Sequence, residues 1–148
     1  MPTPPASNEL LHRHPVRVYW EDTDAGGVVF YANYLKFFER ARTEWLRALG
    51  FSQQRLREET GAIFVVSDTS LRYLRPARLD DELSVTVLRA EAGRASMTID
   101  QQAWRGTELL CEGRIRISCV QAGSFRPCRI PAPVLDKINE PAHAPLPP

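Results

Sequence analysis

One long amphipathic stretch, at about residues 33–49, most constrains what this chain can fold into. Apolar side chains recur there every three or four residues, which is the period of a helix with one buried face. The apolar positions are Tyr34, Phe37, Phe38, Ala41, Trp45 and Leu49. Charged side chains fill the opposite side, and Gly50 follows where helices commonly end. A stripe so rich in aromatic residues predicts a deeply packed central helix.

Strand patterns lie on both sides of this helix. A first strand is predicted from Val16 to Trp20, where apolar and polar residues alternate. Ser52 and Gly61 bound a short second helix. Four strands joined by hairpin-sized turns then follow, at about residues 63–74, 83–87, 95–99 and 109–119, with a last short helix at 134–139. This order predicts an α+β domain in which an antiparallel sheet of about five strands curls around one long helix.

The prolines indicate where the domain begins and ends. Eight of the twelve lie in the first fifteen and the last eight residues, where they cannot extend a helix or join a central strand. We therefore expect one domain over residues 15–140, with flexible tails at 1–14 and 141–148. A chain of 148 residues, 43% of them hydrophobic, is long enough to bury a single core.

Histidine is confined to the predicted tails. His12, His14 and His143 are the three histidines of the chain. A domain without histidine excludes Ser-His-Asp and Cys-His nucleophilic pairs, histidine-ligated zinc and histidine general bases. Its chemistry would then depend on carboxylates, hydroxyls, thiols, arginines or backbone dipoles.

Charge and cysteine content exclude further classes. A net charge of +1 gives no reason to expect nucleic-acid or anionic-membrane binding, and no apolar run approaches the length of a membrane-spanning helix. The first residues lack a secretory signal pattern. Cys111, Cys119 and Cys128 form no CxxC pair, and an extended strand would separate the first two by about 26 Å. We expect free, buried thiols in a cytoplasmic protein, with no metal or cofactor.

The turn before the long helix is the strongest candidate for chemistry. Asp24 precedes Gly26, Gly27 and an apolar segment that leads into the helix. Backbone N–H groups at a helix start are unpaired, and the helix dipole favours negative charge there. A carboxylate in this place could attack a carbonyl group whose oxygen is held by those N–H groups. The alternative is that Asp22 or Asp24 only caps the turn, and that the glycines serve its geometry.

The residues around Asp24 resemble the active-site signature of the 4-hydroxybenzoyl-CoA thioesterase family, whose members have a hot-dog fold. The matching positions are Arg17-Val18, Thr23-Asp24, Gly27-Val28-Val29, Tyr31 and Tyr34. The longer string VRVYWEDTDAGGVVFYANYLKFFERARTEWLR, with FSQQ and PARLDDEL further on, is similar to the Tol-Pal-system-associated acyl-CoA thioesterases, the YbgC-like branch. The resemblance covers roughly residues 15–139.

The resemblance implies an acyl-CoA thioesterase with Asp24 as its catalytic aspartate. That residue would act on the thioester carbonyl as nucleophile or as general base for water. The backbone N–H groups of Phe30 and Tyr31 would polarise the carbonyl oxygen. Many members of this branch carry histidine where Tyr31 stands, and a tyrosine cannot shuttle protons near neutral pH as histidine can.

Several other residues are candidates for substrate binding. Tyr34 fits the signature, although an aromatic residue at that helical position is more often part of the core. Ser67, Asp68 and Thr69 interrupt a strand and could line the acyl pocket, or form a solvated or interface strand face. Four arginines could contact coenzyme A phosphates, or be ordinary surface residues: Arg89, Arg94, Arg126 and Arg129.

The resemblance also implies an assembly. Hot-dog domains usually pair edge to edge, so we expect a homodimer with sites at the subunit interface, doubled to a homotetramer. An alternative to catalysis is a low-turnover interaction module that binds acyl carrier protein or a lipid-synthesis partner. A hot-dog dehydratase fits less well, because those enzymes depend on a core histidine.

Overall fold

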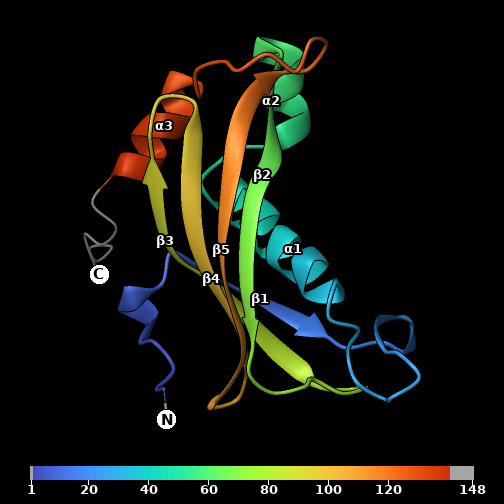
Figure 1. Ribbon diagram of the computed structural model, residues 1–148. Coiled ribbons are helices and arrows are strands. Elements are labelled where there is room, and N and C mark those ends of the chain that lie inside the picture. Colours follow the sequence, from blue (N-terminus) through green and yellow to red (C-terminus); the bar gives the residue numbers. More distant parts are fainter. Residues whose placement is uncertain (1, 141–148) are drawn as a thin grey trace.

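A five-stranded antiparallel sheet wraps around one long helix in the computed structural model, which describes residues 2–140 (Figure 1). The strand order is β1-β3-β4-β5-β2, and α1 is Asn33–Ala48. The strands are β1 His12–Arg17, β2 Ala62–Tyr73, β3 Glu82–Ala92, β4 Ser96–Arg105 and β5 Glu108–Gln121. The predicted α+β architecture is therefore confirmed.

The core forms where α1 meets the sheet. Phe37 and Phe38 are fully buried, and each such side chain contributes about 1.5–3 kcal/mol of hydrophobic stabilisation. The predicted stripe is buried except for Leu49, which lies just past the end of α1 and is half-buried, and Arg42 and Leu46 are buried in addition. Gly50, at φ 100°, ends the helix as expected.

The short helices also lie where the sequence predicts them. Helix α2 is Gln53–Thr60, and the Ser52 hydroxyl at its start accepts a hydrogen bond from the Arg55 N–H at 3.3 Å. Gly61 ends it at φ 74°. Helix α3, Ala132–Asn139, packs beside β3. A single turn of 3-10 helix, Ser7–Glu9, precedes β1.

Strand β1 begins before residue 15, the predicted start of the domain. This strand begins at His12, and its register pairs His12 with Val87 and His14 with Val85. Pro15 is tolerated because β1 is an edge strand with one unpaired side. Two histidines therefore belong to the folded domain, and burial lowers the pKa of His12. The predicted tail at 141–148 lies outside the described residues.

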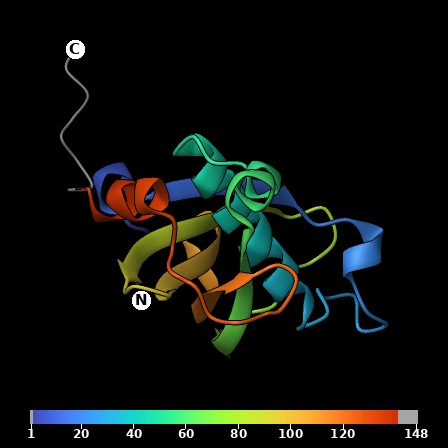
Figure 2. The ribbon, with the colours of Figure 1, turned by 90° about the horizontal axis from the view of Figure 1, so that it is seen from above.

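The first strand also ends earlier than predicted. A single turn of 3-10 helix, Trp20–Asp22, follows β1, and Trp20 is 79% exposed. The tip of the next segment, which includes the exposed residues 24–27, then projects from the body of the molecule (Figure 2). At the other edge of the sheet, residues 66–70 of β2 are exposed on both faces. No helix within residues 2–140 is long and apolar enough to cross a membrane.

Candidate active site

The segment between β1 and α1 is held to the body by Asp22. This side chain is 8% exposed, and its carboxylate accepts the Tyr19 N–H at 2.8 Å. Its carbonyl oxygen accepts two more hydrogen bonds, from the Phe30 N–H at 2.9 Å and the Asn33 side chain at 2.8 Å. Asp22 therefore ties the turn to the first residue of α1. The capping role considered for either aspartate is taken by both, since the Asp22 carboxylate accepts the Tyr19 N–H and the Asp24 carboxylate accepts the Gly26 N–H.

Asp24 lies at the exposed tip of the same segment. One carboxylate oxygen accepts the Gly26 N–H at 2.8 Å, and the backbone closes a tight turn through Asp24 N–H to Val28 C=O at 2.9 Å. The other carboxylate oxygen has no hydrogen bond or ion pair with any atom of residues 2–140. Asp24 is thus oriented through one oxygen and open to a ligand through the other.

The two glycines of this turn have separate roles. A Cβ on Gly26 would lie 3.1 Å from the Asp24 carboxylate oxygen, so a side chain there would crowd the carboxylate. Gly27 has φ +77°, a left-handed conformation that favours glycine. The pair therefore sets both the turn and the free space beside Asp24.

The hydrogen bonds just before α1 change the predicted pair of oxyanion donors. The Phe30 N–H is occupied by the Asp22 carbonyl, so Phe30 does not offer a free donor. The Tyr31 and Ala32 N–H groups donate to no atom within the described chain. Since α1 begins directly after them, the positive end of the helix dipole lies there as well. Tyr31 and Ala32, rather than Phe30 and Tyr31, form the free pair.

A cluster of tyrosines forms one wall beside this helix start. The rings of Tyr31 and Tyr73 lie 6.0 Å apart edge to face, and those of Tyr34 and Tyr73 lie 5.6 Å apart. The Tyr73 hydroxyl donates to the Tyr31 carbonyl at 3.1 Å. With Val29 and Leu74, these rings line an open pocket of about 270 Å³.

Tyr34 combines the two roles between which the sequence left a choice. It is 3% exposed and belongs to the core, yet its ring lines this pocket. Its hydroxyl accepts the Ala77 N–H at 3.1 Å. Burial raises the pKa of both Tyr34 and Tyr73, so the two hydroxyls remain neutral near pH 7. Sequence reasoning missed Tyr73, because it is the last residue of a strand and no local motif marks it.

The predicted pocket residues on β2 lie at a distance from Asp24. Ser67 sits at a β-bulge, donates to the Arg116 carbonyl at 3.3 Å and accepts from the Ser118 hydroxyl at 2.9 Å. Thr69 and Asp68 are exposed next to it. Four residues of extended strand, about 13 Å, separate Thr69 from Tyr73 at the helix start. The solvated-face interpretation fits these residues within one chain.

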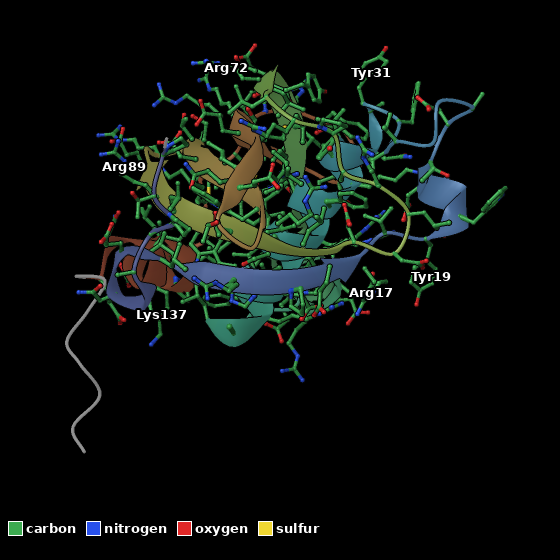
Figure 3. The ribbon with its side chains drawn as sticks, turned by 90° about the horizontal axis from the view of Figure 1, so that it is seen from below. Arg17, Tyr19, Tyr31, Arg72, Arg89 and Lys137 are labelled. Carbon is green, nitrogen blue, oxygen red and sulfur yellow. The ribbon has the colours of Figure 1, made fainter. Side chains whose placement is uncertain are left out.

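The predicted phosphate-contacting arginines also lie apart from Asp24. Arg89 is exposed on β3 and pairs with Asp100 at 3.7 Å, and Figure 3 shows it on a different side of the molecule from Tyr31. Arg94 lies in the β3–β4 turn, and its carbonyl accepts the Ile130 N–H at 2.8 Å, next to Arg129 in the β5–α3 loop that also holds Arg126. That end of the sheet is opposite residues 18–32 (Figure 1). One chain does not bring these arginines to the carboxylate.

Comparisons with known proteins point to one family. A model described as thioesterase superfamily matches residues 26–112, which include Tyr31 and Tyr34 and begin just after Asp24. The acyl-CoA thioesterase YbgC of Haemophilus influenzae is 47% identical over 81% of this chain and 88% of its own length. The acyl-CoA thioester hydrolase YbgC of Escherichia coli is 41% identical over 90% of this chain and 99% of its own length.

A solved structure agrees with these sequence relatives. The crystal structure of a probable thioesterase from Bartonella henselae superimposes with a TM-score of 0.76 at 33% identity, covering 81% of this chain and 98% of that one. The sheet wrapped on a central helix is therefore shared with the structure of that probable thioesterase.

Proposed function

The chain belongs to the thioesterase superfamily, and we propose from this premise that it hydrolyses acyl-CoA thioesters to a free acid and coenzyme A. The proposal depends chiefly on the Asp24 carboxylate, of which only one oxygen accepts a hydrogen bond. This carboxylate lies in the turn that leads to two unpaired N–H groups at the start of α1. Relatives at 41% and 47% identity are named as thioesterases, which favours turnover over a low-turnover binding module.

In the mechanism we propose, Asp24 and the helix start act on opposite ends of the carbonyl group. The Tyr31 N–H, with Ala32, donates to the thioester oxygen as negative charge develops on it. Asp24 either takes a proton from the attacking water or attacks the carbonyl carbon itself, in which case water then cleaves the resulting anhydride. The C–S bond breaks and the thiolate leaves, and water supplies both the hydroxyl of the acid and the proton that converts the thiolate to coenzyme A.

No histidine is needed in this scheme. His12 and His14 lie on β1, where they are paired with β3 rather than with residues 24–32. Tyr31 contributes its backbone N–H and its ring, and the neighbouring Tyr73 hydroxyl donates to the Tyr31 carbonyl. A carboxylate and a helix start therefore carry the proposed chemistry.

The test is a thiol-release assay on acyl-CoA thioesters of graded chain length, including an aromatic one. We expect the wild-type protein to release coenzyme A from at least one of them and Asp24→Asn to lose that activity. Absence of thiol release from every thioester would contradict the proposed hydrolysis. Full activity of Asp24→Asn would contradict the role of this carboxylate.

We propose that a second chain completes the site. The exposed residues 66–70 of β2 offer an unpaired strand edge, and Arg89 and the β3–β4 turn that holds Arg94 lie away from residues 18–32 of the same chain. A homodimer through β2, doubled to a homotetramer, could bring Ser67, Thr69 and these arginines of one subunit toward Asp24 of the other. Light scattering gives the oligomeric state, and Ser67→Arg on the strand edge should shift it toward the monomer.

The family branch supports further proposals about the setting of the reaction. We propose a cytoplasmic enzyme associated with the Tol-Pal system, for which acyl carrier protein is a second candidate partner. Affinity capture with tagged protein, followed by reaction of any captured acyl carrier protein with the enzyme, tests the partner. Capture that survives in Asp24→Asn without hydrolysis would favour the binding-module alternative.

A further inference from the structure

A buried cation on α1 has no ion-pair partner among the described residues. Arg42 is 8% exposed, and no carboxylate oxygen of residues 2–140 lies within 4.0 Å of its guanidinium. Its hydrogen bond runs from Nη1 to the Gln101 Oε1 at 2.9 Å, which is a neutral acceptor. Burial lowers the pKa of Arg42, and Glu39 offsets this in part. A guanidinium remains charged nonetheless, so the fold carries a buried charge that no ion pair within residues 2–140 neutralises.

The position of the guanidinium is fixed from one side. Gln101 is fully buried, and its amide nitrogen donates to the Phe38 carbonyl at 3.0 Å and the Thr86 carbonyl at 3.3 Å. Because these two bonds use the amide nitrogen, the amide oxygen is the atom that faces Arg42. The guanidinium is therefore held by a rigid acceptor that uses only one of its two terminal nitrogens.

The remaining donors of Arg42 face a groove. Every fully buried side-chain nitrogen or oxygen in the described chain has a hydrogen-bond partner, whereas Nε and Nη2 of Arg42 have none. These atoms therefore reach accessible space. That space is a groove of about 280 Å³ between α1 and β2, polar where Glu39, Arg42 and Thr43 line it and apolar along residues 64–66.

The groove and the tyrosine pocket both lie along the seam between α1 and β2. In Figure 1, α1 and β2 run in opposite directions, so Tyr73 lies beside the start of α1 and residues 64–66 lie beside its second half. Arg42 follows Asn33 by nine residues, which is about 13 Å along a helix axis. An acyl chain whose carbonyl lies at the helix start and which follows the seam reaches Arg42 at that distance.

We propose that Arg42 binds a carboxylate at the far end of the acyl group, which makes ω-carboxyacyl-CoA thioesters preferred substrates. This rests on the proposed hydrolysis of acyl-CoA. A distal carboxylate supplies the missing counter-charge and accepts from the two free nitrogens in the forked geometry that a guanidinium favours. The apolar residues of β2 cover the intervening methylene groups. Glu39, at the rim, repels such a ligand and limits the gain.

The test compares pairs of thioesters of equal chain length, one with an ω-carboxylate and one with a methyl end. In the wild-type protein the ratio of kcat/KM, carboxylate over methyl, should exceed one and peak when about 13 Å separates the two carbonyl carbons. Arg42→Met should lower that ratio by about tenfold or more, and Arg42→Lys by less, because it retains charge without the fork. Glu39→Gln should raise the ratio.

Matched controls separate this effect from general damage. Arg47 is on the same helix, but it is exposed and paired with Glu44, so Arg47→Met should leave the ratio unchanged. Arg42→Met leaves the Gln101 oxygen unpaired, so Arg42→Gln, which keeps an uncharged N–H donor in the side chain, serves as the matched variant without the charge. It should show the same lowered ratio.

Binding of free acids gives a readout that does not need catalysis. An α,ω-dicarboxylic acid of the matching length should shift the Arg42 Nε–Hε signal in NMR spectra, and the monocarboxylic acid of equal length should not. If plain acyl-CoA is hydrolysed and no carboxylate preference appears at any length, the inference is overturned while the proposed function stands. If no thioester is hydrolysed, the proposed function fails, and the dicarboxylate shift alone decides the site.

Two other outcomes would also overturn the inference. A preference for ω-hydroxyacyl over ω-carboxyacyl thioesters would assign the groove to a neutral group. A weaker homodimer in Arg42→Met with an unchanged ratio would assign the guanidinium to a second copy of this chain.

Discussion

The segment between β1 and α1 has an inner half, around Asp22, and an outer half, around Asp24. The two aspartates differ in burial although they are close in sequence. In the inner half, Asp22 is buried, and its carboxylate and carbonyl oxygens accept three hydrogen bonds. In the outer half, Asp24 is exposed, and its carboxylate accepts one. The residue type is the same, so the local supply of N–H donors separates the structural aspartate from the chemical one.

This difference explains how a rigid site can retain a reactive group. Asp22 fixes the path of the backbone into α1 by occupying the Phe30 N–H, and this leaves the next two N–H groups free. Asp24 lies on this fixed backbone path, and its own carboxylate needs to accept only one hydrogen bond to be oriented. The inner half should therefore respond to mutation in stability, and the outer half in activity.

The largest expected effect is on the outer carboxylate. Asp24→Asn should lower kcat by about 10²–10⁴-fold, because the amide can neither attack nor take a proton. The free energy of unfolding, measured by urea denaturation, should stay within about 0.5 kcal/mol of wild type, since the residue is exposed. Glu21→Gln, at a neighbouring exposed carboxylate, is the control and should retain activity. Comparable losses in both variants would contradict the division into halves.

The next effect is on the inner carboxylate. Asp22→Ala leaves the Tyr19 N–H unpaired in a partly buried place, so the free energy of unfolding should fall by about 1–3 kcal/mol. Asp22→Asn, which retains an acceptor oxygen, should lose less. Urea denaturation at pH 7 measures both. An Asp22→Ala protein as stable as wild type would show that the carbonyl bonds alone hold the turn.

Most of the fold follows from sequence because its local signals agree. The helical period of Tyr34, Phe38 and Trp45, the cap at Ser52 and the stop at Gly61 all predict elements that the structure contains. The start of β1 does not follow, because Pro15 argues against a strand unless that strand is known to be an edge. Edge position is a property of the tertiary arrangement and leaves no local mark.

The site follows from sequence only in part, and for a similar reason. Asp24 and Tyr31 belong to one continuous motif, so a single stretch of sequence reveals them. Whether the Phe30 N–H is free depends on a backbone carbonyl eight residues earlier, which has no side-chain signature. Tyr73 and Arg42 reach their places only when β2 and β4 pack beside α1. Long-range packing therefore separates the predicted from the unpredicted residues.

A smaller effect is expected from the glycine beside Asp24. Gly26→Ala places a Cβ about 3 Å from the carboxylate oxygen and displaces it, so kcat/KM should fall about tenfold. The free energy of unfolding should change little, because the carboxylate can move into solvent. Gly123→Ala, at a position with open space around it, is the matched control and should change neither quantity. A Gly26→Ala enzyme with full activity would indicate that the Gly26–Asp24 hydrogen bond does not set the reactive geometry.

The smallest effect is expected at Tyr73, in the tyrosine cluster beside the start of α1. Tyr73→Phe removes the hydroxyl that donates to the Tyr31 carbonyl at 3.1 Å, a partly exposed bond of about 0.5–1.5 kcal/mol. Because this bond positions the backbone next to the free N–H groups, the loss should lower kcat/KM by up to about tenfold with KM nearly constant. Tyr19→Phe, at an exposed tyrosine of the inner half, should leave kcat/KM unchanged. A rise in KM alone for Tyr73→Phe would instead make the hydroxyl a ligand contact, which would extend the reactive region from the outer half of the segment to the end of β2.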